Sequence, residues 1–151
     1  MNLKHRLNFY FLESNKHIEK LKKAKEVLNQ FYPFSIDTLE ELDENQKDKL
    51  DVLIFRFSKF QDLIGEKIFR YYFEFSGRNV EIPFIKLLTE LEREGIIEID
   101  KWKELRLIRN NIAHEYPYEE DILIDAINKV LENIDYLIEI KIKIESIVNE
   151  N

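Results

Sequence analysis

The chain between Lys47 and Phe75 reads KDKLDVLIFRFSKFQDLIGEKIFRYYFEF, and its apolar residues recur every three or four positions. That spacing places one set of them along a single face of an α-helix. The set comprises Leu50, Leu53, Ile54, Phe57, Ile64, Ile68, Tyr71 and Phe75. Asp43, with Gln46 three residues later, is typical of a helix N-terminus, and Gly77 follows the last apolar residue. The sequence therefore predicts one long amphipathic helix from about Lys47 to Phe75.

Four other stretches also show helical spacing. We expect a long helix over Leu3–Phe31, which Pro33 ends, and a second long helix over Glu119–Asn149. A short helix is expected from Pro83 to Gly95, and another from Asp100, as its N-cap, to near Pro117. The remaining stretch, Ser35–Gln46, is polar and acidic, and we expect it to be a connector.

Gly65 interrupts the predicted Lys47–Phe75 helix. Glycine inside a helix costs about 1 kcal/mol relative to alanine. We therefore interpret Gly65 as the place where another helix approaches closely; a tolerated defect is the alternative.

The composition favours an all-α fold. Three glycines and three prolines among 151 residues are too few for the many turns of a β-sandwich or barrel. With 44% apolar and 35% charged residues, the chain is typical neither of disordered nor of membrane-spanning proteins. We expect a single domain over residues 1–151, an up-and-down antiparallel bundle of four to five helices. The ends of the longest helices would be available to pair with a second subunit.

Several classes of function are excluded by what the sequence lacks. Without cysteine there is no disulfide, thiolate zinc site or cysteine nucleophile. The chain has neither a glycine-rich phosphate loop nor histidines at metal-binding spacing, so we expect no cofactor and no metal. The net charge of −7 argues against nonspecific binding to DNA or to a membrane. The N-terminus does not resemble a signal peptide, so a cytoplasmic location is expected. His5 and His17 are expected on the surface.

Basic residues gather in one stretch. Residues 101–111 carry a net charge of +3 and the rest of the chain −10. The basic members are Lys101, Lys103, Arg106 and Arg109. Arg109 is expected beside the core-facing side of its helix, where partial desolvation strengthens its interaction with an anion. Asn110 and His114 lie close by, and histidine titrates near neutrality, so the group is suited to bind a phosphodiester and transfer protons. The alternative is that Arg109 pairs with a carboxylate of another helix and His114 stabilises the helix end.

The string RNNIAHEY at residues 109–116 resembles the R-x4-6-H signature of the HEPN superfamily. Asn110 stands where that family commonly has a polar residue. The continuation to Tyr116 resembles the R-x4-H-x-Y form of HEPN toxins that are paired with minimal nucleotidyltransferase antitoxins. The predicted helical bundle, with the motif near the end of a late helix, is also similar to the architecture of the family.

The resemblance implies a metal-independent endoribonuclease toxin of a toxin–antitoxin or defence system. It implies phosphate binding by Arg109, proton transfer by His114 and positioning by Asn110. Lys103 and Arg106, from the basic stretch, are the candidate residues for further binding of RNA. The resemblance also implies a homodimer that brings two motifs into one cleft at the interface. Tyr116 would be the residue that the nucleotidyltransferase partner modifies with adenylate; a buried core tyrosine is the alternative.

Two polar residues of the Lys47–Phe75 helix are candidates for a supporting role. Gln61 falls in the middle of the apolar face, and Asp62 lies on its flank. Buried polar groups need partners, so one of them can hydrogen-bond Arg109 or His114 across the bundle. The interpretation that we favour is that Gln61 bonds a backbone group and Asp62 reaches solvent.

The sequence is also compatible with two other functions. In the first, the protein is a non-catalytic subunit that binds nucleotide or substrate for a nucleotidyltransferase. In the second, it is a structural helical adaptor, and the motif occurs by chance. Degradation of RNA by the purified protein would distinguish the endoribonuclease from both of these alternatives.

Overall fold

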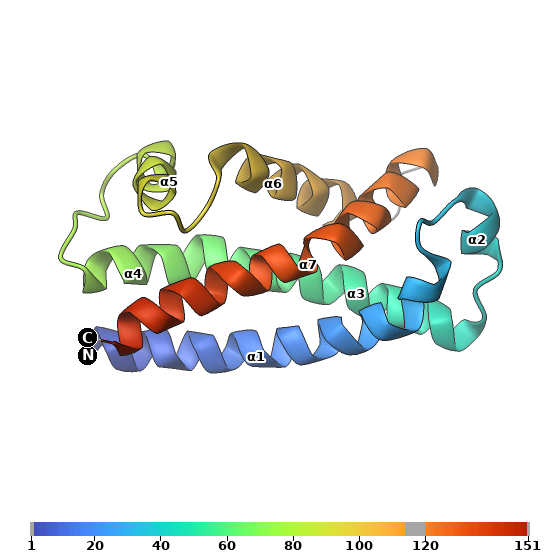
Figure 1. Ribbon diagram of the computed structural model, residues 1–151, viewed down its shortest axis with the longest axis horizontal. Helices are drawn as coiled ribbons and strands as arrows, with labels where there is room; N and C mark the ends of the chain where they lie inside the picture. The colour runs from blue at the N-terminus through green and yellow to red at the C-terminus, as the bar shows by residue number, and fades with distance from the viewer. Residues whose placement is uncertain (1, 114–119, 151) are drawn as a thin grey trace.

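The computed structural model describes residues 2–113 and 120–150, and every regular element in these ranges is helical. Figure 1 shows these helices and the path of the chain between them. The α-helices are α1 (Leu3–Leu28), α2 (Ile36–Glu40), α3 (Glu44–Leu63), α4 (Phe69–Phe75), α5 (Phe84–Arg93), α6 (Ile99–Ala113) and α7 (Glu120–Asn149). A 3₁₀ turn, η1 (Asn29–Phe31), extends α1, and a π-helical turn, η2 (Ile64–Ile68), joins α3 to α4.

The long helices form the antiparallel up-and-down bundle that the sequence predicts. α1, the continuous rod α3–η2–α4, α6 and α7 alternate in direction, and both termini lie at the same end (Figure 1). The short α5 lies across the direction of the others and contacts α6. The all-α expectation is therefore confirmed, with α5 as a crosswise addition to the bundle.

The start of α3 is a capping box, as the sequence predicts. The Gln46 backbone N–H donates to Asp43 Oδ1 at 2.8 Å, and the Asp43 backbone N–H donates to Gln46 Oε1 at 2.9 Å. The box satisfies two backbone donors that the first turn leaves without partners. Because Asp43 is the N-cap, the helix begins at Glu44, three residues before the expected start at Lys47.

The expectation of a plain connector between Ser35 and Gln46 is wrong, since the segment contains the helix α2. A second capping box explains it: the Ser35 and Thr38 side chains each accept a hydrogen bond from the other's backbone N–H. The segment is fixed to α7 by Asn128, whose side chain accepts from the Phe34 N–H at 2.7 Å and donates to the Phe34 carbonyl at 3.1 Å.

The ends of α5 match the prediction, and the start of α6 differs slightly from it. Pro83 is the residue before α5, and Gly95, just beyond its C-terminus, has a φ of +76° that glycine adopts without strain. α6 begins at Ile99, so Asp100 lies within its first turn and does not cap it. An acidic side chain there still interacts favourably with the helix dipole.

The close approach predicted at Gly65 is confirmed. A Cβ built at this position would lie 3.0 Å from Cζ2 of Trp102, a contact so tight that the indole would have to shift slightly to make room for it. Trp102 is buried and packs beside Phe69, with ring centroids 4.9 Å apart. The contact fixes α6 against the rod formed by α3, η2 and α4.

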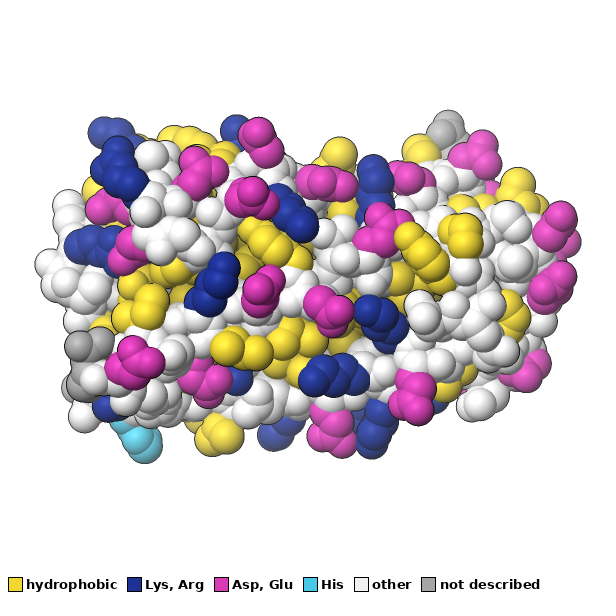
Figure 2. All heavy atoms as spheres, in the orientation of Figure 1, with side chains coloured by type: hydrophobic (Ala, Val, Ile, Leu, Met, Phe, Trp, Pro, Cys, Tyr) yellow, Lys and Arg dark blue, Asp and Glu magenta, His cyan; other side chains and the backbone are white. Residues whose placement is uncertain are grey.

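The face of the molecule in Figure 2 is of mixed charge. On the face in Figure 2, acidic and basic side chains are interspersed, with apolar side chains between them. Within residues 2–113 and 120–150, none of the helices combines the length and apolarity that a bilayer span requires.

The surface location expected for His17 is wrong, whereas His5 is exposed as predicted. His17 packs between α1 and α3, beside the Phe60 ring, and its Nδ1 lies 3.3 Å from Nη1 of Arg56. Burial, followed by the positive charges of Arg56 and Lys59, lowers the pKa of His17 below its ordinary value. The sequence did not predict the burial of His17, because its neighbours on α1 include lysines that face solvent while His17 faces the core.

The neutral state of His17 makes stability depend on pH. Because the unfolded histidine binds a proton at a higher pH than the folded one does, the free energy of unfolding should fall as pH drops from 7.5 to 5. Urea denaturation should show a smaller fall for His17→Gln than for the wild type, and an unchanged fall for the exposed-site control His5→Gln. An identical fall in all three proteins would contradict this assignment.

Candidate functional site

The exposed face of α6 carries most of the predicted RNA-binding residues. Lys103, Arg106 and Asn110 are exposed on it, together with Leu107, whose side chain is 58% exposed. The core-facing side of the helix carries Leu105 and other buried apolar residues. The two faces form because apolar and polar residues alternate along α6 at the 3.6-residue period of the helix.

Arg109 does not belong to that exposed face, because its side chain turns toward α3. Its Nε donates to Asp62 Oδ1 at 3.0 Å and its Nη2 donates to Asp62 Oδ2 at 2.8 Å. This is a bidentate ion pair, the geometry that a guanidinium and a carboxylate prefer. Neither of these two bonds uses Nη1, the third nitrogen of the guanidinium.

Arg106 binds the same carboxylate. Its Nη1 lies 3.2 Å from Asp62 Oδ1, so this oxygen accepts from both arginines. One negative charge is thus shared by two positive charges, and the cluster of Asp62, Arg106 and Arg109 keeps a net charge of +1. The side chains of Asp62 and Arg109 are 18% and 27% exposed, so solvent weakens the pair only in part.

The electrostatics keep Arg109 cationic. The hydrogen bond to Asp62, opposed by a smaller effect of burial, raises the pKa of Arg109 above its ordinary value. Arg109 is therefore suited to bind an anion and to stabilise developing negative charge, and unsuited to exchange protons at neutral pH.

Asp62 had been expected to reach solvent, with an ion pair to Arg109 as the less favoured alternative; the structure shows the ion pair. Gln61, the other supporting candidate, is fully buried, and neither its Nε2 nor its Oε1 has a hydrogen-bond partner within the part of the chain that the structure describes. The expectation that it satisfies a backbone group is therefore wrong, and it forms no bond with Arg109.

His114 and Tyr116 lie outside the described residues. The geometry of the site is consequently defined by Arg109, its neighbours on α6, and Asp62. Within the described ranges, no three side chains of histidine, aspartate or glutamate converge as they would around a metal ion.

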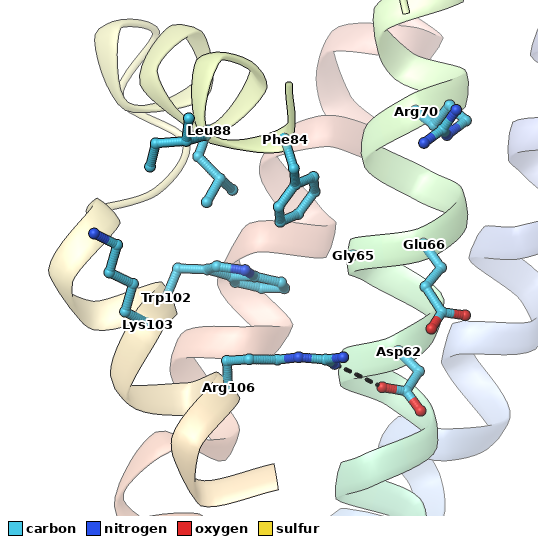
Figure 3. A pocket seen from close by; sticks show the side chains of 10 residues that line it. Asp62, Gly65, Glu66, Arg70, Phe84, Leu88, Trp102, Lys103 and Arg106 are labelled. Carbon is cyan, nitrogen blue, oxygen red and sulfur yellow. Dashed lines mark hydrogen bonds and ion pairs between the residues drawn. The ribbon is translucent and has the colours of Figure 1, made fainter. Parts of the chain in front are cut away.

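A cavity of about 580 Å³ opens beside the ion-pair cluster, between α5, α6 and the α3–η2–α4 rod (Figure 3). Figure 3 shows Arg106 reaching across to Asp62 below Trp102, with Phe84 above the indole. Trp102, Phe84 and Arg70 line this cavity, and none of them is among the functional residues that the sequence predicts. The one hint in the sequence was Gly65, which lines the cavity and lets the Trp102 indole approach the rod closely.

Comparison with protein-family models, with curated proteins and with solved structures finds no match for this chain. The features of this chain that bear on function are the geometry of these side chains and the R-x4-H string.

The Asp62–Arg109 pair should contribute measurably to stability. A double-mutant cycle of Asp62→Ala and Arg109→Ala in urea denaturation should give a coupling energy of about 1 kcal/mol or more, because the pair is bidentate and partly buried.

The exposed pair Lys23–Glu19 is the matched control, with a distance of 3.1 Å and side chains 58% and 63% exposed. Its coupling should not exceed about 0.5 kcal/mol. Equal coupling energies for the two pairs would show that the Asp62–Arg109 contact does not hold Arg109 in place.

Proposed function

We propose that this protein is a metal-independent endoribonuclease toxin that cleaves RNA by attack of a ribose 2′-hydroxyl on the adjacent phosphate. The observation that supports this most strongly is the Arg109 guanidinium, which donates two hydrogen bonds to the Asp62 carboxylate that Arg106 also binds. It combines a pre-oriented cation, partial burial and a nitrogen, Nη1, that the bonds to Asp62 do not use, at the position that the R-x4-H string assigns to phosphate binding. A preorganised donor of this kind stabilises charge that develops in a transition state.

The proposed reaction needs no metal. A base removes the 2′-hydroxyl proton, the 2′-oxygen bonds to phosphorus, and the bond from phosphorus to the 5′-oxygen breaks. An acid protonates the leaving 5′-oxygen, so the products are a 2′,3′-cyclic phosphate and a 5′-hydroxyl. His114 would transfer protons, Arg109 would stabilise the negative charge on the phosphorane, and Asn110 would position the nucleotide. Lys103 and Arg106 would bind neighbouring phosphates.

Asp62 acts in this scheme as a positioning residue. Without it, the Arg109 side chain would lose the two bonds that fix its plane, and its charge would lie partly buried without a partner. The approach of a phosphodiester offers Arg109 a second anion at Nη1 while Asp62 still holds the other two nitrogens.

A dimer is part of the proposal because one chain supplies a single motif histidine, whereas the reaction needs both a base and an acid. A twofold axis would bring two copies of His114 together. Leu107 supports an interface on this face, since a 58% exposed leucine among polar side chains is what a second subunit would cover.

The toxin assignment extends to a partner. A nucleotidyltransferase antitoxin would transfer adenylate from ATP to the Tyr116 oxygen with release of pyrophosphate, and so silence the enzyme. The binding-subunit function differs from this one in a single respect: RNA is bound and not cut.

Purified protein should cleave single-stranded RNA in EDTA. Arg109→Ala should lower kcat by about 10²-fold or more, because it removes a preorganised donor to the transition state. His114→Ala should reduce cleavage at least as strongly, whereas His5→Ala, on the exposed start of α1, should cleave normally. Circular dichroism would check that each variant remains helical.

Cleavage that persists in both Arg109→Ala and His114→Ala would contradict the assignment. RNA binding without cleavage by the wild type would favour the non-catalytic binding subunit. Neither binding nor cleavage would favour the structural adaptor.

The dimer can be tested separately by sedimentation. The wild type should sediment as a dimer at micromolar concentration, and Leu107→Glu should be monomeric and inactive, since a charge would then be buried at the interface. Leu12→Glu is the matched control, because Leu12 is 65% exposed on α1. A dimer broken by Leu12→Glu and retained by Leu107→Glu would place the interface elsewhere.

A further inference from the structure

The cavity beside the ion-pair cluster has the construction of a small-molecule site. Its volume of about 580 Å³ falls within the roughly 300–1,000 Å³ that is usual for ligand pockets. Trp102 and Leu88 form a buried apolar floor, and Phe84, 45% exposed, stands at the opening. Figure 3 shows the Phe84 ring extending from α5 toward the indole of Trp102. An apolar interior with an accessible aromatic ring suits a flat heterocycle.

The rim of the cavity is basic. Arg70, Lys103 and Arg106 line it, against the acidic Asp62 and Glu66. Asp62 is already shared by two arginines, one of which, Arg109, lies next to the cavity. Neither Arg70 nor Lys103 forms an ion pair with any described residue, so both are available to an anionic ligand.

The cavity and the proposed phosphate site share an atom. Asp62 Oδ1 accepts from Arg106, which lines the cavity, and from Arg109, which would bind the scissile phosphate. A phosphate bound at Arg109 would therefore lie close to a group in the cavity that contacts Arg106. Bases of single-stranded nucleic acid bind in this way, stacked on aromatic side chains with their phosphates along a basic rim.

From this arrangement we propose that the cavity between α5, α6 and the α3–η2–α4 rod is a nucleobase pocket for the RNA nucleotide next to the cleaved bond. The base contacts Phe84 and Trp102, and its phosphates contact Lys103, Arg106 and Arg70. The inference rests on RNA being the ligand of the proposed function, and it adds a site that determines which base is held there.

Trp102 makes the pocket directly observable, because it is the only tryptophan in the chain. The probe is a 2′-O-methyl RNA oligonucleotide of about eight nucleotides, within the roughly 4–16 that single-strand binding modules cover. It lacks the attacking hydroxyl, so binding is measured on the wild-type protein whether or not the protein is an enzyme. Cytidine 5′-monophosphate is the second probe.

The oligonucleotide should quench Trp102 fluorescence, and at lower concentration than the free nucleotide does, because its neighbouring phosphates reach Arg106 and Arg109. Phe84→Ala should weaken oligonucleotide binding by about five- to 150-fold, the range for loss of one stacked base. Lys103→Glu should weaken it as well. Two matched controls, Phe9→Ala and Lys22→Glu on the exposed side of α1, should bind as the wild type does.

Each other outcome is decisive. Oligonucleotide binding that is unaffected by Phe84→Ala and Lys103→Glu, or that leaves Trp102 fluorescence unchanged, overturns the pocket even if the protein cleaves RNA. Quenching by free nucleotide at the same or lower concentration than the oligonucleotide overturns the RNA assignment in favour of a free-nucleotide site. Pocket-dependent oligonucleotide binding by a protein that does not cleave RNA supports the pocket and refutes the proposed nuclease.

Discussion

Trp102 packs against the bare backbone at Gly65, and the position of α6 relative to α3 depends on this contact. A Cβ at position 65 would lie 3.0 Å from the indole, so glycine at this position allows the close contact between the two helices. Asp62 lies about one turn before Gly65, and Arg106 and Arg109 lie one and two turns after Trp102. Residues at these spacings share a side of their helix, so the packing contact brings the carboxylate opposite the two guanidinium groups.

The shared carboxylate reconciles two interpretations of Arg109 that the sequence presents as alternatives. Arg109 does pair with a carboxylate of another helix, yet this pairing does not use up its capacity to bind an anion. Two arginines on one aspartate leave a net positive charge, and the partial exposure of the cluster leaves it open to a ligand. An ion pair that stabilises the free protein thus also orients a group for the proposed reaction.

The fold was largely predictable because helical periodicity and capping are local properties of the sequence. Asp43 and Gln46 mark the start of α3, and Gly95 follows the end of α5, as short-range rules require. The helix α2 was missed because Ser35 and Thr38 form a capping box through a hydroxyl in place of the usual longer side chain. The burial of His17 was missed because its lysine neighbours suggested an exposed face.

The site was predictable only in part, since its main interaction joins residues 47 positions apart. The R-x4-H string predicted Arg109 as a site residue. Whether Asp62 binds Arg109 or faces solvent depends on how α3 and α6 pack. The cavity is lined by three separate segments, the α3–η2–α4 rod, α5 and α6, and Gly65 is the only lining residue whose type indicated a special role. Such features follow from tertiary packing and have no local pattern.

The most direct measurement of the central claim is the chemistry of the cut ends. The substrate is a DNA oligonucleotide that contains one ribonucleotide, prepared with each of the four bases at that position. It is incubated with the protein in EDTA, and the masses of the products are determined by mass spectrometry. The account predicts cleavage only on the 3′ side of the ribose, with a 2′,3′-cyclic phosphate on one product and a 5′-hydroxyl on the other. Products that carry a 5′-phosphate, or cuts between deoxyribonucleotides, would contradict it.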